Sequence, residues 1–255
     1  MPNVYACQLD CVWHSPQANH DAARAALSGH TVVPGSLIVL PEMFDVGFTM
    51  DGKTACAASE ITGTFLSELA RTTRSTVVAG HAMCDATGRA LNQASVFDAS
   101  GSRLSQYVKC HAFTPAGEHE SYAPGEGATL FEWAGLKVAP LICYDLRFPE
   151  VFRAGVKLGA EAFIVVANWP VARVEHWITL AKARAIENLA YVVAVNRCGR
   201  DPNYAYPGRS IIIDPKGEVL AEAGDGVEVL TAMIDPQRVR DWRRDFPALR
   251  DARFL

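Results

Sequence analysis

Three reactive side chains follow stretches of the sequence that predict strands. Glu42, Lys109 and Cys143 each come just after such a stretch, and the apolar run before the cysteine spans residues 138–142. Side chains just past the carboxyl ends of strands are held on rigid elements, and α/β proteins build their sites there. We therefore expect a carboxylate, an ammonium and a thiol to converge if these strands are neighbours in one sheet.

This combination of groups predicts a thiol hydrolase. A free cysteine thiol has a pKa of about 8.5, so it is mostly protonated at neutral pH. A glutamate within hydrogen-bond reach can take that proton as general base. A lysine favours the thiolate and the negative charge of a tetrahedral intermediate. Taken singly, each residue has an ordinary interpretation: a buried inert thiol, a solvated loop carboxylate and a solvated surface ammonium.

The stretch around Cys143 strengthens the catalytic interpretation. The cysteine lies where a strand gives way to a helix that begins near Phe148-Pro149, and proline is favoured in a first helical turn. Backbone N–H groups just after a nucleophile at such a corner are available to an oxyanion. The N–H of Tyr144 is therefore a candidate oxyanion donor.

The remaining sequence predicts one mixed α/β domain over residues 1–255, with a tail from about residue 235 extending from it. Strands alternate with helices at first and then come in pairs, which favours helices on both faces of the sheets. The stretch 45–58 is expected to be an irregular surface loop, and 114–127 a long loop of the functional kind. Predicted helices cover 16–27, 60–74, about 149–158, 175–189 and 236–242; predicted strands cover 4–9, 37–40, 75–81, 91–97, 103–108, 129–133, 137–142, 162–166, 190–195, 210–213, 218–223 and 227–234.

Composition excludes several classes of protein. The net charge is −4 with no basic block, which disfavours nucleic acid as a partner, and no apolar run is long enough to span a bilayer. The N-terminus lacks the features of a signal peptide, so we expect a cytoplasmic protein. Seven cysteines without a disulfide-like framework then predict free thiols. No cysteine or histidine spacing predicts a metal site.

Three segments in order resemble the nitrilase, or carbon–nitrogen hydrolase, superfamily. They are LPEMF at 40–44, YVKCHAF at 107–113 and LICYDLRFPE at 141–150. The resemblance covers residues 4 to about 234, and three motifs in order are far more specific than one. It implies an α–β–β–α sandwich with mixed sheets, a Glu42–Lys109–Cys143 triad, no metal or organic cofactor, and a homodimer or larger homo-oligomer. The apolar end Phe254-Leu255 also favours an oligomer.

Within the superfamily, the segments VANWPVARVEHW and ARAIENLAYVVAVNRCG resemble the ω-amidase branch. That branch hydrolyses the terminal amide of 2-oxoglutaramate or 2-oxosuccinamate, so the implied partner is a small amide. Glu118 matches the second glutamate of the family loosely and could orient Lys109 or the substrate amide. Arg147 and Asn168 are candidate supports of the site. Arg173 is a candidate for binding the substrate carboxylate, with arginines 147, 197 and 209 as alternatives.

Three other functions compete with ω-amide hydrolysis. A related hydrolase could act on nitriles, N-carbamoyl compounds or other aliphatic amides with the same triad. A non-catalytic member of the fold would be expected to lack an intact triad. A thiol redox protein would be expected to pair Cys143 with a second cysteine in a CxxC motif, which is missing.

Overall fold

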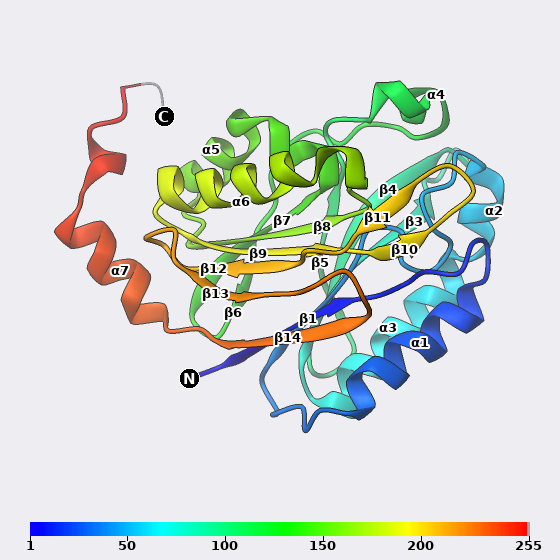
Figure 1. Ribbon diagram of the computed structural model, residues 1–255, viewed down its shortest axis with the longest axis horizontal. Coiled ribbons are helices and arrows are strands. Elements are labelled where there is room, and N and C mark those ends of the chain that lie inside the picture. The colour runs from blue at the N-terminus through cyan, green and yellow to red at the C-terminus, as the bar shows by residue number, and fades with distance from the viewer. Residues whose placement is uncertain (254–255) are drawn as a thin grey trace.

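The computed structural model describes residues 1–253, so the apolar pair Phe254-Leu255 lies outside the described residues. Its centre is formed by two six-stranded mixed sheets that pack face to face (Figure 1). Helices cover both outer faces, which confirms the predicted α–β–β–α sandwich. Within residues 1–253, no helix is long and apolar enough to cross a bilayer.

The first sheet has the order β14-β1-β2-β3-β4-β5. β1, β2 and β3 are parallel, and β4, β5 and β14 pair antiparallel with their neighbours. Its strands are β1 (Asn3–Gln8), β2 (Leu37–Leu40), β3 (Thr76–Cys84), β4 (Ala90–Phe97), β5 (Arg103–Val108) and β14 (Glu228–Met233).

The second sheet has the order β13-β12-β9-β8-β7-β6, with β7, β8 and β9 parallel at its centre. A separate pair, β10 (Cys198–Arg200) and β11 (Ala205–Pro207), was not predicted from the sequence. The strands of the second sheet are β6 (Phe131–Trp133), β7 (Leu136–Ile142), β8 (Ala162–Ala167), β9 (Tyr191–Asn196), β12 (Ile211–Ile213) and β13 (Val219–Glu222).

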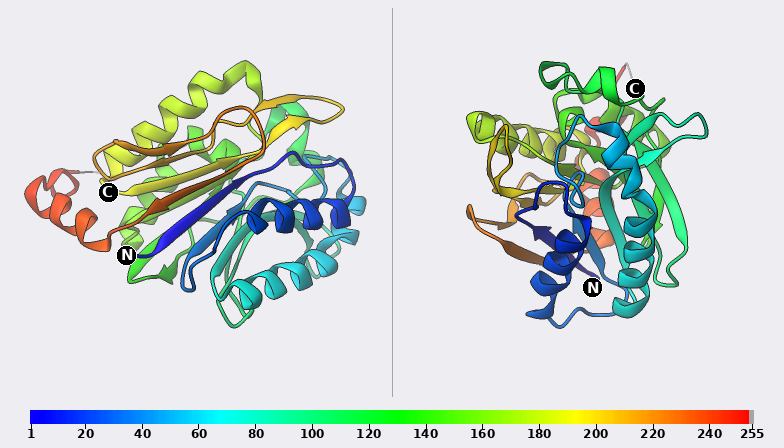
Figure 2. Two further views of the ribbon diagram at one scale, coloured as in Figure 1. Left: turned by 60° about the horizontal axis from the view of Figure 1, so that its bottom comes forward. Right: turned by 90° about the vertical axis from the view of Figure 1, so that its right-hand side faces the viewer.

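The helices lie on the outer faces (Figure 2). α1 (Pro16–Ser28) and α3 (Ser59–Thr73) cover the first sheet, and α5 (Pro149–Leu158) and α6 (Val174–Asn188) cover the second. The helices can cover this face because apolar side chains on β1 point alternately to its two sides. Val4 and Ala6 point between the sheets, while Tyr5 and Cys7 pack toward α1 and α3. The chain continues past β14 into α7 (Pro236–Asp245) and the short η4 (Ala248–Arg250).

The stretch 45–58 is not the surface loop that the sequence predicted. Residues 45–49 are buried, and the helix α2 (Gly52–Ala57) follows them. Val46 and Phe48 pack in a small core with Tyr122, whose hydroxyl donates to the carbonyl of Thr49 at 2.7 Å. The prediction failed because Tyr122 comes from a distant part of the chain, and local sequence does not reveal what covers a segment.

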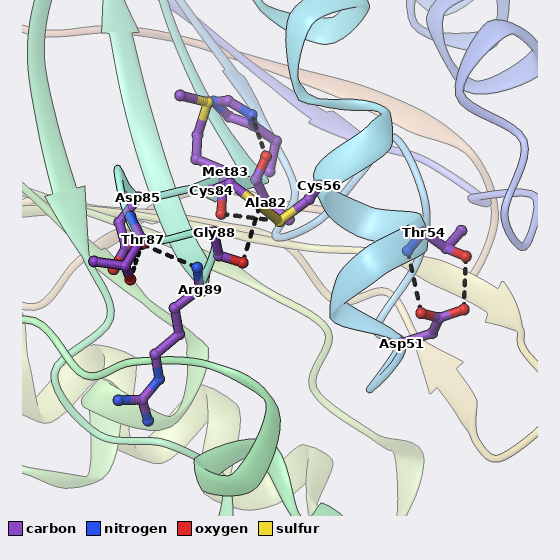
Figure 3. The surroundings of a disulfide bond; sticks show 11 residues. Asp51, Thr54, Cys56, Ala82, Met83, Cys84, Asp85, Thr87, Gly88 and Arg89 are labelled. Carbon is purple, nitrogen blue, oxygen red and sulfur yellow. Dashed lines mark hydrogen bonds between the residues drawn. A yellow bond between two sulfur atoms is a disulfide. The ribbon is translucent and has the colours of Figure 1, made fainter.

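The expectation that all cysteines are free thiols is also wrong. Cys56 of α2 and Cys84 at the end of β3 form a disulfide, with Cα atoms 5.4 Å apart (Figure 3). The two positions are 28 residues apart in the sequence and meet because α2 packs against β3. The cysteines that remain free are Cys7, Cys11, Cys110, Cys143 and Cys198.

Candidate active site

Glu42, Lys109 and Cys143 converge between the two sheets. Glu42 follows β2 and Lys109 follows β5 in the first sheet, whereas Cys143 follows β7 in the second. From the sequence we expected these groups to converge if their strands were neighbours in one sheet. The structure instead places the strands in two sheets. The side chains meet because the two sheets pack face to face, which places their strand ends opposite one another.

Glu42 is completely buried, and its carboxylate accepts several hydrogen bonds. Oε1 accepts from Lys109 Nζ and from Asn92 Nδ2, both at 2.8 Å. Oε2 accepts from the backbone N–H of Asn168 at 2.8 Å. A glycine is needed on the adjacent strand, since a Cβ atom at Gly80 would lie 2.5 Å from the Glu42 Cα. The charge of Glu42 is thus held by donors from both sheets.

Lys109 lies between two carboxylates. Its Nζ is 2.8 Å from Glu42 Oε1 and 3.0 and 2.9 Å from the two oxygens of Glu118. Burial would lower the pKa of the ammonium, but Glu118 and Glu42 outweigh it and raise that pKa above its ordinary value. Lys109 therefore stays protonated. These three contacts equal the three N–H donors of an ammonium, so a reacting oxygen would have to take the place of one glutamate oxygen.

Glu118 belongs to the same buried cluster, which gives the loosely matched second glutamate a definite position. It begins the short helix α4 (Glu118–Ser121) within the loop 114–127. Besides Lys109, it accepts from Asn92 Nδ2 at 2.8 Å and from the backbone N–H of Phe113 at 2.6 Å. These contacts orient Glu118 so that both of its oxygens face the lysine.

Cys143 lies at a sharp turn directly after β7. Its backbone φ is +45°, a left-handed conformation that is uncommon outside glycine and marks strain. The short 3-10 helix η2 (Cys143–Arg147) begins there, and N–H groups of a first helical turn have no partners within that turn. The side chain is 8% exposed. Burial, and then the charge of Glu42, raise the pKa of the thiol, so the resting group is S–H and needs a base.

Two asparagines complete the cluster. Asn168, a predicted support, follows β8, and its Nδ2 donates to the carbonyl of Glu42 at 2.8 Å. Asn92 on β4 was missed, although it bridges the two carboxylates that flank Lys109. A polar residue within a predicted buried strand was the available signal, because such groups require specific partners.

A narrow pocket opens from Cys143 toward solvent. Half of its lining residues are aromatic, and one of these, Tyr204 from the β10–β11 loop, was not indicated by the sequence. The lining residues are Phe48, Phe113, Cys143, Tyr144, Arg147, Asn168, Trp169, Pro170, Arg173 and Tyr204.

Two of the candidate arginines lie in this pocket. The guanidinium of Arg173 lies 5.3 Å from the centre of the Phe113 ring, and that of Arg147 lies 4.9 Å from the ring of Trp169. Neither forms an ion pair with a carboxylate among residues 1–253. The other two candidates are engaged elsewhere, since Arg197 pairs with Asp10 and Arg209 pairs with Glu222.

No group of three histidine, cysteine, aspartate or glutamate residues with metal-binding geometry occurs in the described part of the chain. The buried cluster brings together a thiol, two carboxylates and an ammonium in a setting that water hardly reaches. Such a setting strengthens electrostatic contacts with a developing negative charge.

The sandwich and the buried cluster at its centre define the class of protein as an amidohydrolase acting on non-peptide carbon–nitrogen bonds. The family model described as carbon-nitrogen hydrolase matches residues 3–244, and the chain belongs to this family.

Named relatives agree with this assignment. An omega-amidase, YafV, of Yersinia enterocolitica is 36% identical over 96% of this chain and 94% of its own length. A 2-oxoglutaramate amidase of Bacillus subtilis is 34% identical over 98% of this chain and 97% of its own. The crystal structure of XC1258 from Xanthomonas campestris superposes with a TM-score of 0.90 at 32% identity, covering 100% of this chain and 98% of that one. It is described as a CN-hydrolase superfamily protein with an arsenic adduct in the active site. These similarities support amide hydrolysis as the activity.

Proposed function

We propose that this chain hydrolyses the terminal amide of a small ω-amido 2-oxo acid, 2-oxoglutaramate or 2-oxosuccinamate, to the dicarboxylate and ammonia. The observation that carries the proposal is the position of two arginines in the pocket that leads to Cys143, neither of them paired with a carboxylate of residues 1–253. A guanidinium binds a carboxylate through paired hydrogen bonds, and the aromatic walls suit a short carbon chain. The names of the relatives point to the same substrate class.

The first half of the proposed reaction forms a thioester. Glu42 takes the proton of the Cys143 thiol as the sulfur attacks the amide carbonyl carbon. The resulting oxyanion accepts hydrogen bonds from Lys109, in place of one of its contacts with Glu118, and from the backbone N–H of Tyr144. The carbon–nitrogen bond then breaks as Glu42 returns the proton to nitrogen, and ammonia leaves.

The second half releases the acid. Water attacks the thioester carbon while Glu42 takes a proton from it, and the same two donors hold the second oxyanion. The carbon–sulfur bond breaks, the Cys143 sulfur recovers a proton, and the product leaves as a carboxylate. Glu118 keeps Lys109 oriented through both halves, and Asn168 keeps Glu42 oriented.

Arg173 is proposed to bind the α-carboxylate of the substrate. It precedes α6 on the turn that follows the end of β8, and it lines the pocket. Arg147 also lines the pocket, but its Nη2 is 3.1 Å from His176 Nδ1. That contact occupies part of its hydrogen-bonding capacity, which favours Arg173 as the carboxylate ligand.

The test is ammonia release from 2-oxoglutaramate, 2-oxosuccinamate, glutamine, neutral aliphatic amides, nitriles and N-carbamoyl compounds. The expected result is the highest kcat/KM for the two oxo acid amides, with no carbon dioxide from the carbamoyl compounds. Cys143→Ala should release no ammonia while keeping the melting temperature of a folded protein. Higher kcat/KM for a nitrile or carbamoyl compound would overturn the proposed substrate, and an active Cys143→Ala variant would overturn the mechanism.

A further inference from the structure

A third buried carboxylate, that of Asp145, lies beside the two of the catalytic cluster but has no role in the reaction proposed above. The residue is fully buried two positions after Cys143. Its carboxylate accepts hydrogen bonds from two segments of the chain, one of which carries Lys109 and the other Cys143. No lysine or arginine pairs with it in the described part of the chain, so its charge depends on these donors.

The first segment is the end of β5 and the residues after it. The hydroxyl of Tyr107 donates to Asp145 Oδ2 at 2.8 Å, and the backbone N–H of His111 donates to Oδ1 at 3.0 Å. The His111 ring places Nδ1 2.8 Å from the same Oδ1, which requires the tautomer that carries its proton there. Tyr107 and His111 lie two residues before and two residues after Lys109. Asp145 therefore binds a residue on each side of the lysine, Tyr107 through its hydroxyl and His111 through its backbone N–H and its ring.

The second segment is the turn that carries the nucleophile. Oδ2 of Asp145 also accepts from the backbone N–H of Ile142 at 3.1 Å, so the side chain reaches back across Cys143. This bond closes the turn in which the cysteine adopts its left-handed conformation. A strained backbone persists only where surrounding contacts hold it, and this is one of those contacts.

We propose that Asp145 is a positioning residue that sets the distance and direction between the Lys109 ammonium and the Cys143 thiol. One carboxylate joins the segment on both sides of the lysine to the turn on both sides of the cysteine. These segments come from different sheets, and within the described residues 1–253 no backbone ladder joins them. Stacking of His111 on Phe148, with ring centres 3.8 Å apart, holds the histidine in place for its part of the bridge. The inference rests on the proposed thiol mechanism.

Graded variants separate positioning from folding. Asp145→Asn replaces one accepting oxygen by an NH2 donor. That donor then faces the hydrogen-bond donors of at least one of the two segments, so their bonds to this position are lost. Tyr107→Phe removes one hydrogen bond and leaves the turn at Cys143 unaltered. His111→Leu removes the ring donor, whereas His111→Asn keeps a donor nitrogen at the same place in the side chain. Asp214→Asn is the control, since Asp214 is also buried and accepts from two backbone N–H groups, of Lys216 and Glu218, in the β12–β13 turn; unlike Asp145, it also pairs with Arg238.

Each folded variant is measured for kcat, KM and the rate of Cys143 alkylation by iodoacetamide. We expect Asp145→Asn to lower kcat by about 10²-fold, in line with losing one positioned catalytic group, with KM changed by less than about threefold. Tyr107→Phe and His111→Leu should each lower kcat by about tenfold, and His111→Asn should recover most of that loss. Alkylation should slow in the same order, and Asp214→Asn should lower only the melting temperature.

Wild-type kcat and alkylation rate in folded Asp145→Asn would overturn the proposal. If that variant does not fold, Tyr107→Phe and the two His111 variants decide: wild-type rates in them, or equal losses in His111→Leu and His111→Asn, would overturn it. The alkylation measurement needs no substrate, so it tests the positioning role even if none of the ω-amides is hydrolysed. Failure of the proposed substrate and failure of this inference are thereby distinguishable.

Discussion

Breaking the Cys56–Cys84 disulfide should destabilise the protein without abolishing catalysis. The bond ties α2 to the end of β3, and α2 follows the buried segment whose Phe48 lines the pocket. That segment is also held independently of the disulfide, because Tyr122 and Ser121 donate to its carbonyls at 2.7 and 2.8 Å. We therefore expect the pocket wall to stay in place and the free energy of unfolding to decrease.

The size of the effect follows from the length of chain that the bond closes. In the chain-entropy description, a cross-link between residues 28 apart stabilises the folded state by about 3.6 kcal/mol at 25 °C. For a chain of this size, 1 kcal/mol shifts the melting temperature by about 2–4 °C, so reduction should lower it by about 7–14 °C. The value of kcat at 25 °C should change by less than about threefold, or under about 1 kcal/mol of transition-state stabilisation.

The assay compares melting temperature and ammonia release with and without a reducing agent, and repeats both on the Cys56→Ser/Cys84→Ser double variant. The double variant should melt like the reduced wild type and should not respond to the reducing agent. Thiol titration in denaturant should find five thiols before reduction and seven after it. Seven thiols without reduction, or equal melting temperatures in the two conditions, would refute the reasoning.

Three further predictions concern single side chains. Asn92→Leu removes the hydrogen-bond donors to both buried glutamates and should lower kcat by about 10²-fold. The control Gln93→Leu loses only a hydrogen bond to a serine on the same strand and should change kcat by less than about threefold. Equal losses of kcat in the two variants would contradict a specific role of Asn92. Arg173→Ala should lower kcat/KM for 2-oxoglutaramate by about ten- to a hundredfold and leave a neutral aliphatic amide nearly unchanged; equal losses on both would mean that the arginine supports the fold. Burial raises the pKa of Asp45 to about 7, above its unfolded value, so the folded state binds this proton more tightly and loses stability as the pH rises from about 4 to about 7. Asp45→Asn cannot ionise, so its melting temperature relative to wild type should be higher at pH 8 than at pH 5, with a gain of at most about 4 kcal/mol; a difference independent of pH would contradict the shift.

Much of the architecture was accessible from local sequence patterns. Apolar runs such as 37–40 and 162–166 predicted strands that the structure contains within a residue or two, and the helices 16–27 and 175–189 were likewise located. These elements follow from side-chain periodicity, which is a property of neighbouring residues. The three motifs around Glu42, Lys109 and Cys143 identified the family, and the family match over residues 3–244 confirms it.

What local sequence did not reveal are the contacts between distant segments. In the sequence, Asn92 is a single polar residue within a predicted strand. It lies between two glutamates because β4 packs between β3 and β5. The burial of residues 45–49 and the meeting of Cys56 with Cys84 have the same origin. In each case the decisive neighbour is tens of residues away, where spacing along the chain carries no information on distance in space.

The choice among the arginines shows the same division. Four of them were chemically equivalent candidates in the sequence. The tertiary structure pairs Arg197 and Arg209 with carboxylates and leaves Arg147 and Arg173 at the pocket. The sequence by itself determined which reactive groups are present and that each follows a strand, because those properties are local. The packing of the two sheets then brings Cys143 and Asn168 of the second sheet to Glu42 and Lys109 of the first, because it joins strand ends that no single sheet would bring together.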